Sequence, residues 1–258
     1  MRSLKSRIVG AAAVAFFATA LTAADPTLSA DLSGKVIEAD LAHLTKLVDL
    51  AKTKKVGGRV KSASVLLALY AQDQLGGKDA AKMTALRDAA LKIAGKAKTS
   101  TAVTKDQAGF AADVAALAKV SGGAAGKPID PKKILEETKL ELHEVMDLFG
   151  SAVGGGMNLE KDIQKIKKEG TSDLAAAQLI GARTALLADL TLWLPNEKAG
   201  SGAAKKQWDD YSAEMKKFSL DLAAEAAKGD KADKAKIKTA ASKLDASCTN
   251  CHNKFRAD

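Results

Sequence analysis

The residues with the clearest chemical meaning are Cys248, Cys251 and His252, which form the pattern Cys-Thr-Asn-Cys-His within the last eleven residues of the chain. On a helix, positions three apart share a face, so two thiols at this spacing can add to the two vinyl groups along one edge of a porphyrin. The adjacent imidazole then reaches the iron. Because this spacing is that of c-type haem attachment sites, the pattern predicts one covalently bound haem c with His252 as a ligand of the metal.

Other uses of two cysteines fit the sequence less well. A thioredoxin-like redox pair normally lies beside a βαβ unit, which this sequence does not predict. Half of a zinc site would need two further thiol or imidazole ligands, but the chain has only two cysteines and its other two histidines are remote in sequence. A disulfide between Cys248 and Cys251 would close a tight, strained loop on a continuing helix. Haem attachment is therefore the favoured interpretation.

The composition predicts an all-α protein. Of the 258 residues, 47% are hydrophobic and 28% are charged, which excludes collagen-like, disordered and disulfide-rich classes. Long runs of Ala, Lys, Leu, Asp and Glu favour helices, and the 4% of aromatic residues leave little material for sheets. The expected architecture is two helical bundles in tandem.

Residues 1–24 have the form of a secretory signal peptide. Arg2, Lys5 and Arg7 precede an uncharged apolar run, and small residues follow at positions 22–24. The run is shorter than the ~20 apolar residues that span a bilayer, and no other segment is apolar enough to cross one. We expect a protein exported to the periplasm, with no membrane segment after signal cleavage.

The net charge of +9 does not indicate nucleic-acid binding. Without the three cations of the signal segment, 37 basic and 31 acidic residues leave a net charge of +6. Lysines and acids are interspersed along the expected helices, which indicates a solvated surface. Lysines near an exposed haem edge could guide an acidic redox partner protein.

Residues 25–121 are expected to form an N-terminal helical domain without a haem site. Apolar residues recur at helical spacing, or in one nearly continuous run, in four segments separated by glycines. These segments are 41–51, 65–70, 83–93 and 110–117. Four helices with short links are predicted, followed by a flexible, glycine-rich linker at 122–129.

Residues 130–258 are expected to form a four-helix bundle. Asp130 is a suitable N-cap and Pro131 a suitable first helical residue, because proline lacks only an amide hydrogen that would be unpaired there. Gly150 can close this helix in the left-handed conformation. The first bundle helix is thus predicted over about 131–149.

Three further helices are predicted in the bundle. One begins near residue 172 and ends before Pro195, one carries the apolar stripe 208–222, and the last carries the stripe 237–255 with both cysteines on its buried face. The segment 159–168 is read as a short extra helix. Four aromatic residues are expected to pack the bundle, and some of them to wall the haem. They are Trp193, Trp208, Tyr211 and Phe218.

The end of the chain resembles that of the cytochromes c′ and their low-spin relatives. An apolar last helix closes with Cys248, Cys251, His252, Phe255 and Arg256. The resemblance covers about residues 130–258 and implies a haem held among four helices, with His252 as its proximal ligand. It also implies a homodimer formed through the first bundle helix. Arg256 is similar to the family's basic residue beside the proximal imidazole, although a cation is also favourable at any helix C-terminus.

The resemblance also implies a distal residue on the first bundle helix. Eleven positions after Pro131 stands Leu142, with Phe149 and Gly150 completing the similarity. Leucine cannot ligate iron, so this interpretation gives a five-coordinate haem that can bind NO or CO. Met146, one turn later on the same face, is the alternative, and its thioether would give a six-coordinate electron-transfer haem.

Three other side chains are weaker candidates. His143 is expected on the surface because it falls outside the apolar stripe. Met157 is a third possible source of a thioether ligand. His43 is expected to be an ordinary histidine of the N-terminal half, where no cysteine could hold a second covalent haem.

Two classes of function follow. One is a non-enzymatic haem protein that carries electrons or binds small gases. The other is a haem enzyme such as a peroxidase, which needs acid or base groups near the iron. The expected distal wall of Leu142, Met146 and Phe149 offers none, so a carrier or gas binder is preferred.

Overall fold

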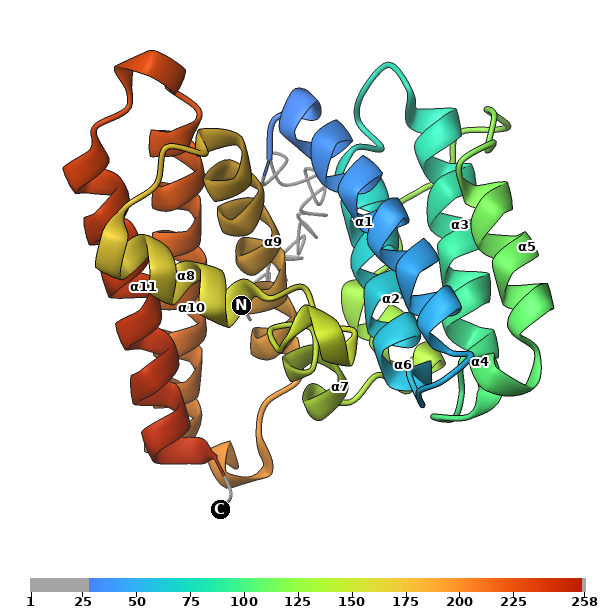
Figure 1. Ribbon diagram of the computed structural model, residues 1–258. Helices are drawn as coiled ribbons and strands as arrows, with labels where there is room; N and C mark the ends of the chain where they lie inside the picture. Colours follow the sequence, from blue (N-terminus) through green and yellow to red (C-terminus); the bar gives the residue numbers. More distant parts are fainter. Residues whose placement is uncertain (1–27, 257–258) are drawn as a thin grey trace, which may run out of the picture.

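The computed structural model describes residues 28–256, and all regular secondary structure within this range is helical. The all-α prediction is confirmed. Figure 1 shows two groups of helices side by side, one from each half of the chain. The signal-peptide prediction for residues 1–24 lies outside the described residues. Within the described part, none of the helices combines the length and the apolar character that a membrane crossing requires.

The N-terminal group contains the four helices that the apolar segments predict, together with one short extra helix. They are α1 (Ala30–Leu50), α2 (Gly57–Asp73), α3 (Ala80–Lys96), the short α4 (Ala102–Lys105) and α5 (Gln107–Leu117). Helix α2 is in contact with both α1 and α3. It is buried on nearly every side, which explains why its apolar run is continuous instead of periodic.

The prediction of a single helix over 131–149 is wrong. The structure has α6 (Pro131–Thr138) and α7 (Leu142–Met146), separated by Lys139 in the left-handed conformation at φ 49°. The predicted start is correct, because the Asp130 side chain accepts a hydrogen bond from the backbone of Lys132. The helix ends early because the backbone N–H of Leu140 bonds the carbonyl of Leu135, the pattern of a Schellman cap.

The C-terminal group is a bundle of four helices. They are α8 (Leu159–Glu169), α9 (Leu174–Trp193), α10 (Gly202–Ala226) and α11 (Lys234–Phe255). Helix α10 packs on α9 and α11, and α8 packs on α11 and α9. In Figure 1, α8 crosses in front of its neighbours. The segment read as a short extra helix is therefore a member of the bundle, in the place that the prediction gave to 131–149.

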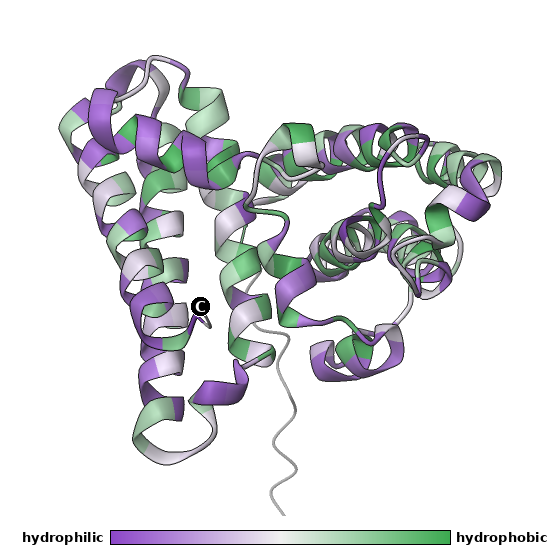
Figure 2. Cartoon of the chain, turned by 60° about the horizontal axis from the view of Figure 1, so that its bottom comes forward, coloured by the Kyte–Doolittle hydropathy of each residue, from purple (hydrophilic) through white to green (hydrophobic). Residues whose placement is uncertain are grey.

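Helices α6 and α7 connect the two groups. Helix α6 packs on α2 and α3, whereas α7 contacts α2 and α9. One continuous hydrophobic core includes residues of both halves. In Figure 2, hydrophilic and hydrophobic positions alternate along the helices, as expected for amphipathic helices that share buried faces. The two groups thus meet through packed side chains.

A buried ion pair adds to this junction. Asp40 of α1 is almost fully buried and accepts a hydrogen bond of 2.7 Å from Nε of Arg183 in α9. Burial raises the pKa of Asp40 to about 6, and the attraction of Arg183 offsets only part of this effect. One turn away, burial and the charges of Arg183 and Lys46 lower the pKa of His43 to about 4.

These two groups have opposite effects on stability over the same pH range. Asp40 stabilises the fold below pH 4, and this contribution is lost as the pH rises through 6. His43 stabilises the fold above pH 6.5, and that contribution is lost as the pH falls through 4. In the unmodified protein, the two changes largely cancel.

Replacement of His43 should reveal the contribution of Asp40. For His43→Gln, we expect the free energy of unfolding relative to the unmodified protein to fall by on the order of 3 kcal/mol as the pH rises from 4 to 6.5, since one pKa unit corresponds to about 1.4 kcal/mol. Urea denaturation at several pH values measures this difference. Parallel pH profiles for the two proteins would show that His43 titrates normally in the fold.

Candidate functional site

A cavity of about 670 Å³ lies among the C-terminal helices and α7. Its size is within the range of small-molecule and cofactor sites. The seven residues expected to surround the haem all line it: Leu142, Met146, Phe149, Cys248, Cys251, His252 and Arg256. The fold therefore brings the two distant segments of the sequence to one place.

Helix α11 positions the two thiols. Its N-cap Asp233 accepts hydrogen bonds from the backbone of Ala235 and Lys236, which fixes the start of the helix. Both cysteines lie on the side of α11 that lines the cavity, and neither forms a disulfide. Sγ of Cys248 is 3.8 Å from Sδ of Met215 in α10.

The surroundings of the thiols do not suit redox or thiolate chemistry. Burial raises the pKa of Cys248 to about 12 and that of Cys251 to about 11. Reactive and metal-binding cysteines have lowered thiol pKa values instead. Within the described residues, no cluster of three His, Cys, Asp or Glu side chains is arranged to hold a metal ion. The zinc and redox-pair interpretations thus gain no support.

His252 is exposed at the cavity and follows directly on Cys251. No hydrogen bond of the described residues involves its imidazole, so both ring nitrogens are free to bind another group. The helix ends at the next turn, where the backbone N–H of Arg256 bonds the carbonyl of His252 at 3.0 Å. Nζ of Lys198 donates to the Arg256 carbonyl at 3.0 Å, which anchors this end of the helix.

Aromatic side chains form one wall of the cavity. The rings of Trp208 and Phe255 meet edge to face, with centroids 5.2 Å apart, and Tyr211 meets Phe255 at 6.3 Å. Nε1 of Trp208 donates to the carbonyl of Thr191 at 2.8 Å, which satisfies its buried donor. Leu142 and Cys251 pack against this group. The result is a mostly apolar wall beside Cys251.

Residues 153–256 match the family model described as cytochrome C′. The C-terminal bundle is a cytochrome c′ domain. The match includes α8 to α11 and all three residues of the attachment pattern, and membership of this family implies a covalently bound c-type haem. No curated protein and no solved structure matches the chain.

The family match begins later than the resemblance suggests. It starts at residue 153 instead of about 130, so α6 and α7 precede the matched part of the cytochrome c′ domain. Leu142 and Met146 thus belong to a segment outside the match. Their selection still rests on the sequence resemblance, and the structure adds that α7 contributes a wall of the cavity.

Helix α7 offers both distal candidates to the haem cavity. Leu142 packs on the aromatic wall, whereas Met146 and Phe149 pack against the main hydrophobic core. His143 has 72% of its side chain exposed and lies 3.1 Å from Glu141, as the surface prediction requires, although it also reaches the rim of the cavity. Of the expected aromatic residues, Trp193 and Phe218 pack against the main core instead of lining the cavity.

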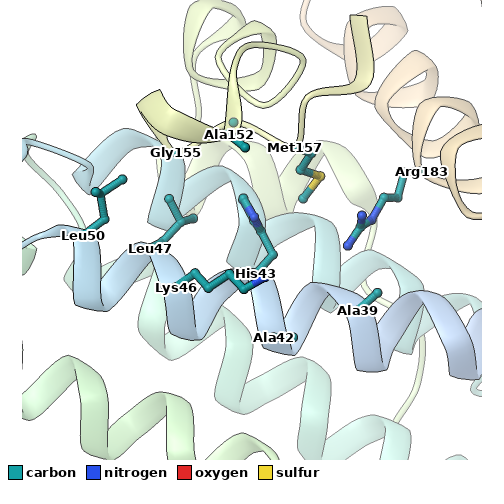
Figure 3. A pocket seen from close by; sticks show the side chains of 11 residues that line it. Ala39, Ala42, His43, Lys46, Leu47, Leu50, Ala152, Gly155, Met157 and Arg183 are labelled. Carbon is teal, nitrogen blue, oxygen red and sulfur yellow. The ribbon is translucent and has the colours of Figure 1, made fainter. Parts of the chain in front are cut away.

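Met157 does not line the haem cavity, so the prediction of a third thioether candidate is wrong. It lines a second cavity of about 480 Å³ between α1 and α9, together with His43, Lys46 and Arg183 (Figure 3). Nε2 of His43 is buried there without a hydrogen-bond partner among the described residues. The glycine-rich loop before α8 turns Met157 toward this cavity.

Further residues that line the haem cavity could not be identified from the sequence. Arg59, from α2, forms an ion pair of 3.1 Å with Asp147, which follows α7. Glu160 of α8 and Met215 of α10 also line the cavity. These contacts join segments far apart in the chain, so no local spacing indicated them. The wall near α7 is therefore less apolar than Leu142, Met146 and Phe149 alone suggest.

Proposed function

We propose that this chain is an exported c-type cytochrome that carries one haem c. Cys248 and Cys251 would hold the porphyrin as thioethers, and His252 would bind the iron. One observation carries the proposal. Two free thiols, an imidazole without a hydrogen-bond partner and an apolar wall all line the same cavity. We assign it to electron transfer, to the binding of small gases such as NO and CO, or to both.

The residues present fit a haem. Its apolar faces suit the apolar wall that Trp208 and Phe255 form, and both thiols are free on the side of α11 that lines the cavity. Bound haem supplies an iron that can change oxidation state and accept a ligand. The protein supplies the proximal ligand, excludes water and shapes the opposite side.

A five-coordinate iron is the favoured form of this proposal. Leu142 lies at the cavity on a helix whose start is held in place: Nζ of Lys61 lies 2.8 Å from the Glu144 carboxylate, which also accepts a bond from the backbone of Glu141. A leucine side chain can exclude water but cannot ligate iron. Met146 packs against the main core, which supports an open sixth position at the iron.

The alternative is a six-coordinate iron with Met146 as its sixth ligand, because Met146 lines the same cavity one turn after Leu142. The variant Met146→Leu separates the two forms. If the iron is five-coordinate, this variant should retain the high-spin spectrum and bind CO as the unmodified protein does, because leucine replaces methionine at similar volume. Loss of a methionine-to-iron charge-transfer band together with new CO binding would establish the six-coordinate carrier.

We further propose that the protein is not an enzyme. A peroxidase needs acid and base groups placed at the open side of the iron. Of the ionisable residues that line the cavity, Arg59 and Asp147 are paired with each other and Asp245 is paired with Lys167. His143 and Glu160 are exposed. A steady-state assay with hydrogen peroxide and a reducing dye tests this proposal. Turnover that depends on His143 would favour the enzyme instead.

The proposed location and partners follow the same reasoning. Export to the periplasm rests on the predicted signal peptide and on the family, whose members are typically periplasmic. An acidic redox partner could dock on α8, which lines the cavity and exposes four lysines. These are Lys161, Lys165, Lys167 and Lys168. A homodimer remains an implication of the family resemblance.

A further inference from the structure

One cation of the haem cavity comes from the N-terminal group of helices. Arg59 lies in the first turn of α2, outside the cytochrome c′ domain, and still lines the cavity. Its Nη2 is 3.1 Å from Oδ2 of Asp147, and 24% of its side chain is exposed. Its Nε is buried and has no hydrogen-bond partner among the described residues. A side chain that lines the cavity thus keeps one buried donor of its charged group without an acceptor.

The loop before α8 holds Arg59 in this position. Gly155 has φ 93°, a conformation that favours glycine. A Cβ atom there would lie 3.2 Å from Cδ of Arg59 and 2.9 Å from a methyl group of Leu47. The glycine therefore lets the loop close over the aliphatic part of the arginine. Only the guanidinium group is left to reach the cavity.

A haem at this site brings two carboxylates with it. The propionate groups lie on the porphyrin edge opposite the two thioether bonds, so an attachment at α11 directs them away from that helix. In Figure 1, α11 and α2 lie on opposite sides of α7. The propionates would therefore extend toward the side of the cavity that Arg59 lines.

The cavity also needs a cation for these carboxylates. Three acidic residues, Asp147, Glu160 and Asp245, line it, and a propionate beside an unpaired acid would be repelled. Asp245 is paired with Lys167 at 2.7 Å, and Asp147 is paired with Arg59. The other arginine of the cavity is Arg256, which is exposed at the end of α11, next to the thioether side.

We propose that Arg59 binds a haem propionate through its unused Nε, and that the N-terminal helices thereby complete the haem site. The inference rests on the proposed attachment of haem. A guanidinium group offers parallel N–H donors that match a carboxylate, and Asp147 holds one of its nitrogens in place. The haem then joins the two groups of helices, which gives residues 25–121 a role in the cytochrome.

The test compares Arg59→Gln with the unmodified chain, each produced with haem and, in a host without c-type cytochrome maturation, without haem. If Arg59 binds only Asp147, the variant loses the same stability in both forms. If it also binds a propionate, we expect the unfolding equilibrium constant of the haem-loaded form to rise at least about tenfold more than that of the haem-free form. Urea denaturation measures both.

Reduction potential gives a second measurement on the loaded protein. Removal of a cation beside the haem favours the ferric state, so we expect Arg59→Gln to shift the reduction equilibrium up to about tenfold, or about 59 mV downward for one electron. Lys52→Gln is the matched control, because Lys52 is an exposed cation of the same group of helices and does not line the cavity. Its potential should be unchanged.

Two outcomes overturn the proposal. One is an equal loss of stability with and without haem, and the other is a potential that Arg59→Gln leaves at the value of Lys52→Gln. If Arg59→Gln does not fold, Arg59→Lys is compared with the unmodified chain by urea denaturation with and without haem, because lysine keeps the charge but lacks the planar fork. Absence of attached haem in the unmodified chain would instead contradict the proposed function, and mass spectrometry detects that separately.

Discussion

Replacement of both cysteines should abolish covalent haem attachment. In Cys248→Ala/Cys251→Ala, no thioether can form, so we expect denaturing electrophoresis followed by haem staining to show no signal, against one haem per chain in the unmodified protein. Each single variant should keep at most a weaker, single linkage. The effect is large because the described chain contains no other cysteine, and both thiols line the same cavity.

Asn250→Ala provides the matched control. Asn250 lies between the two cysteines in the attachment pattern, and its side chain is exposed. We expect this variant to stain like the unmodified protein, because neither the thiols nor the imidazole of His252 is altered. Haem retained covalently by the double cysteine variant, or lost equally in the asparagine variant, would contradict the assigned roles.

Lys61→Met should destabilise the protein strongly and release α7 from α2. Lys61 and Glu144 are almost completely buried and lie 2.8 Å apart, and Lys61 also donates to the carbonyl of Lys139 at 3.2 Å. Removal of one partner leaves a buried charge without compensation, which costs about 3–5 kcal/mol. Urea denaturation should show this loss. The affinity for CO should change as well, because α7 carries Leu142 at the cavity.

The paired variant Lys61→Met/Glu144→Leu distinguishes a buried charge from lost packing. Two apolar side chains of similar volume can replace a buried ion pair with little loss, so the double variant should recover the cost of the unpaired charge and keep only the smaller loss of the cap that the Glu144 carboxylate gives to the backbone of Glu141. The exposed pair Lys35 and Asp31, 2.7 Å apart, is the control, and Lys35→Met should change stability by less than about 1 kcal/mol. A double variant as unstable as Lys61→Met would show that the charges themselves do not matter.

Much of the fold could be predicted because the apolar pattern that specifies each helix is local in the sequence. The four apolar segments of the N-terminal half became α1, α2, α3 and α5, and the stripe that includes both cysteines became α11. The attachment pattern needed only the spacing of three residues within one helix. For the same reason, the wall of Trp208 and Tyr211 could be expected from the stripe on α10.

The break between α6 and α7 could not be predicted from the apolar pattern. The apolar positions continue across it, because both short helices bury one face against neighbours. The start of α7 depends on Glu144, whose carboxylate caps this helix and pairs with Lys61 in a distant helix. Local spacing contains no information about such a partner.

The polar residues at the edge of the cavity could not be predicted for the same reason. Arg59 reaches the site only because α7 packs on α2, and Asp147 meets it only after the helix break. Met157 follows three glycines and is a possible source of a thioether by sequence alone, but the glycine-rich loop directs it to another cavity. Pairwise contacts between distant segments therefore decided which candidates meet the thiols.

Mass spectrometry of the exported protein tests the central claim most directly. After expression in a host that matures c-type cytochromes, we expect one mature chain that carries the mass of a single haem, linked through the peptide with Cys248 and Cys251. A mature chain with two free thiols, or with a disulfide and no added tetrapyrrole, would contradict it.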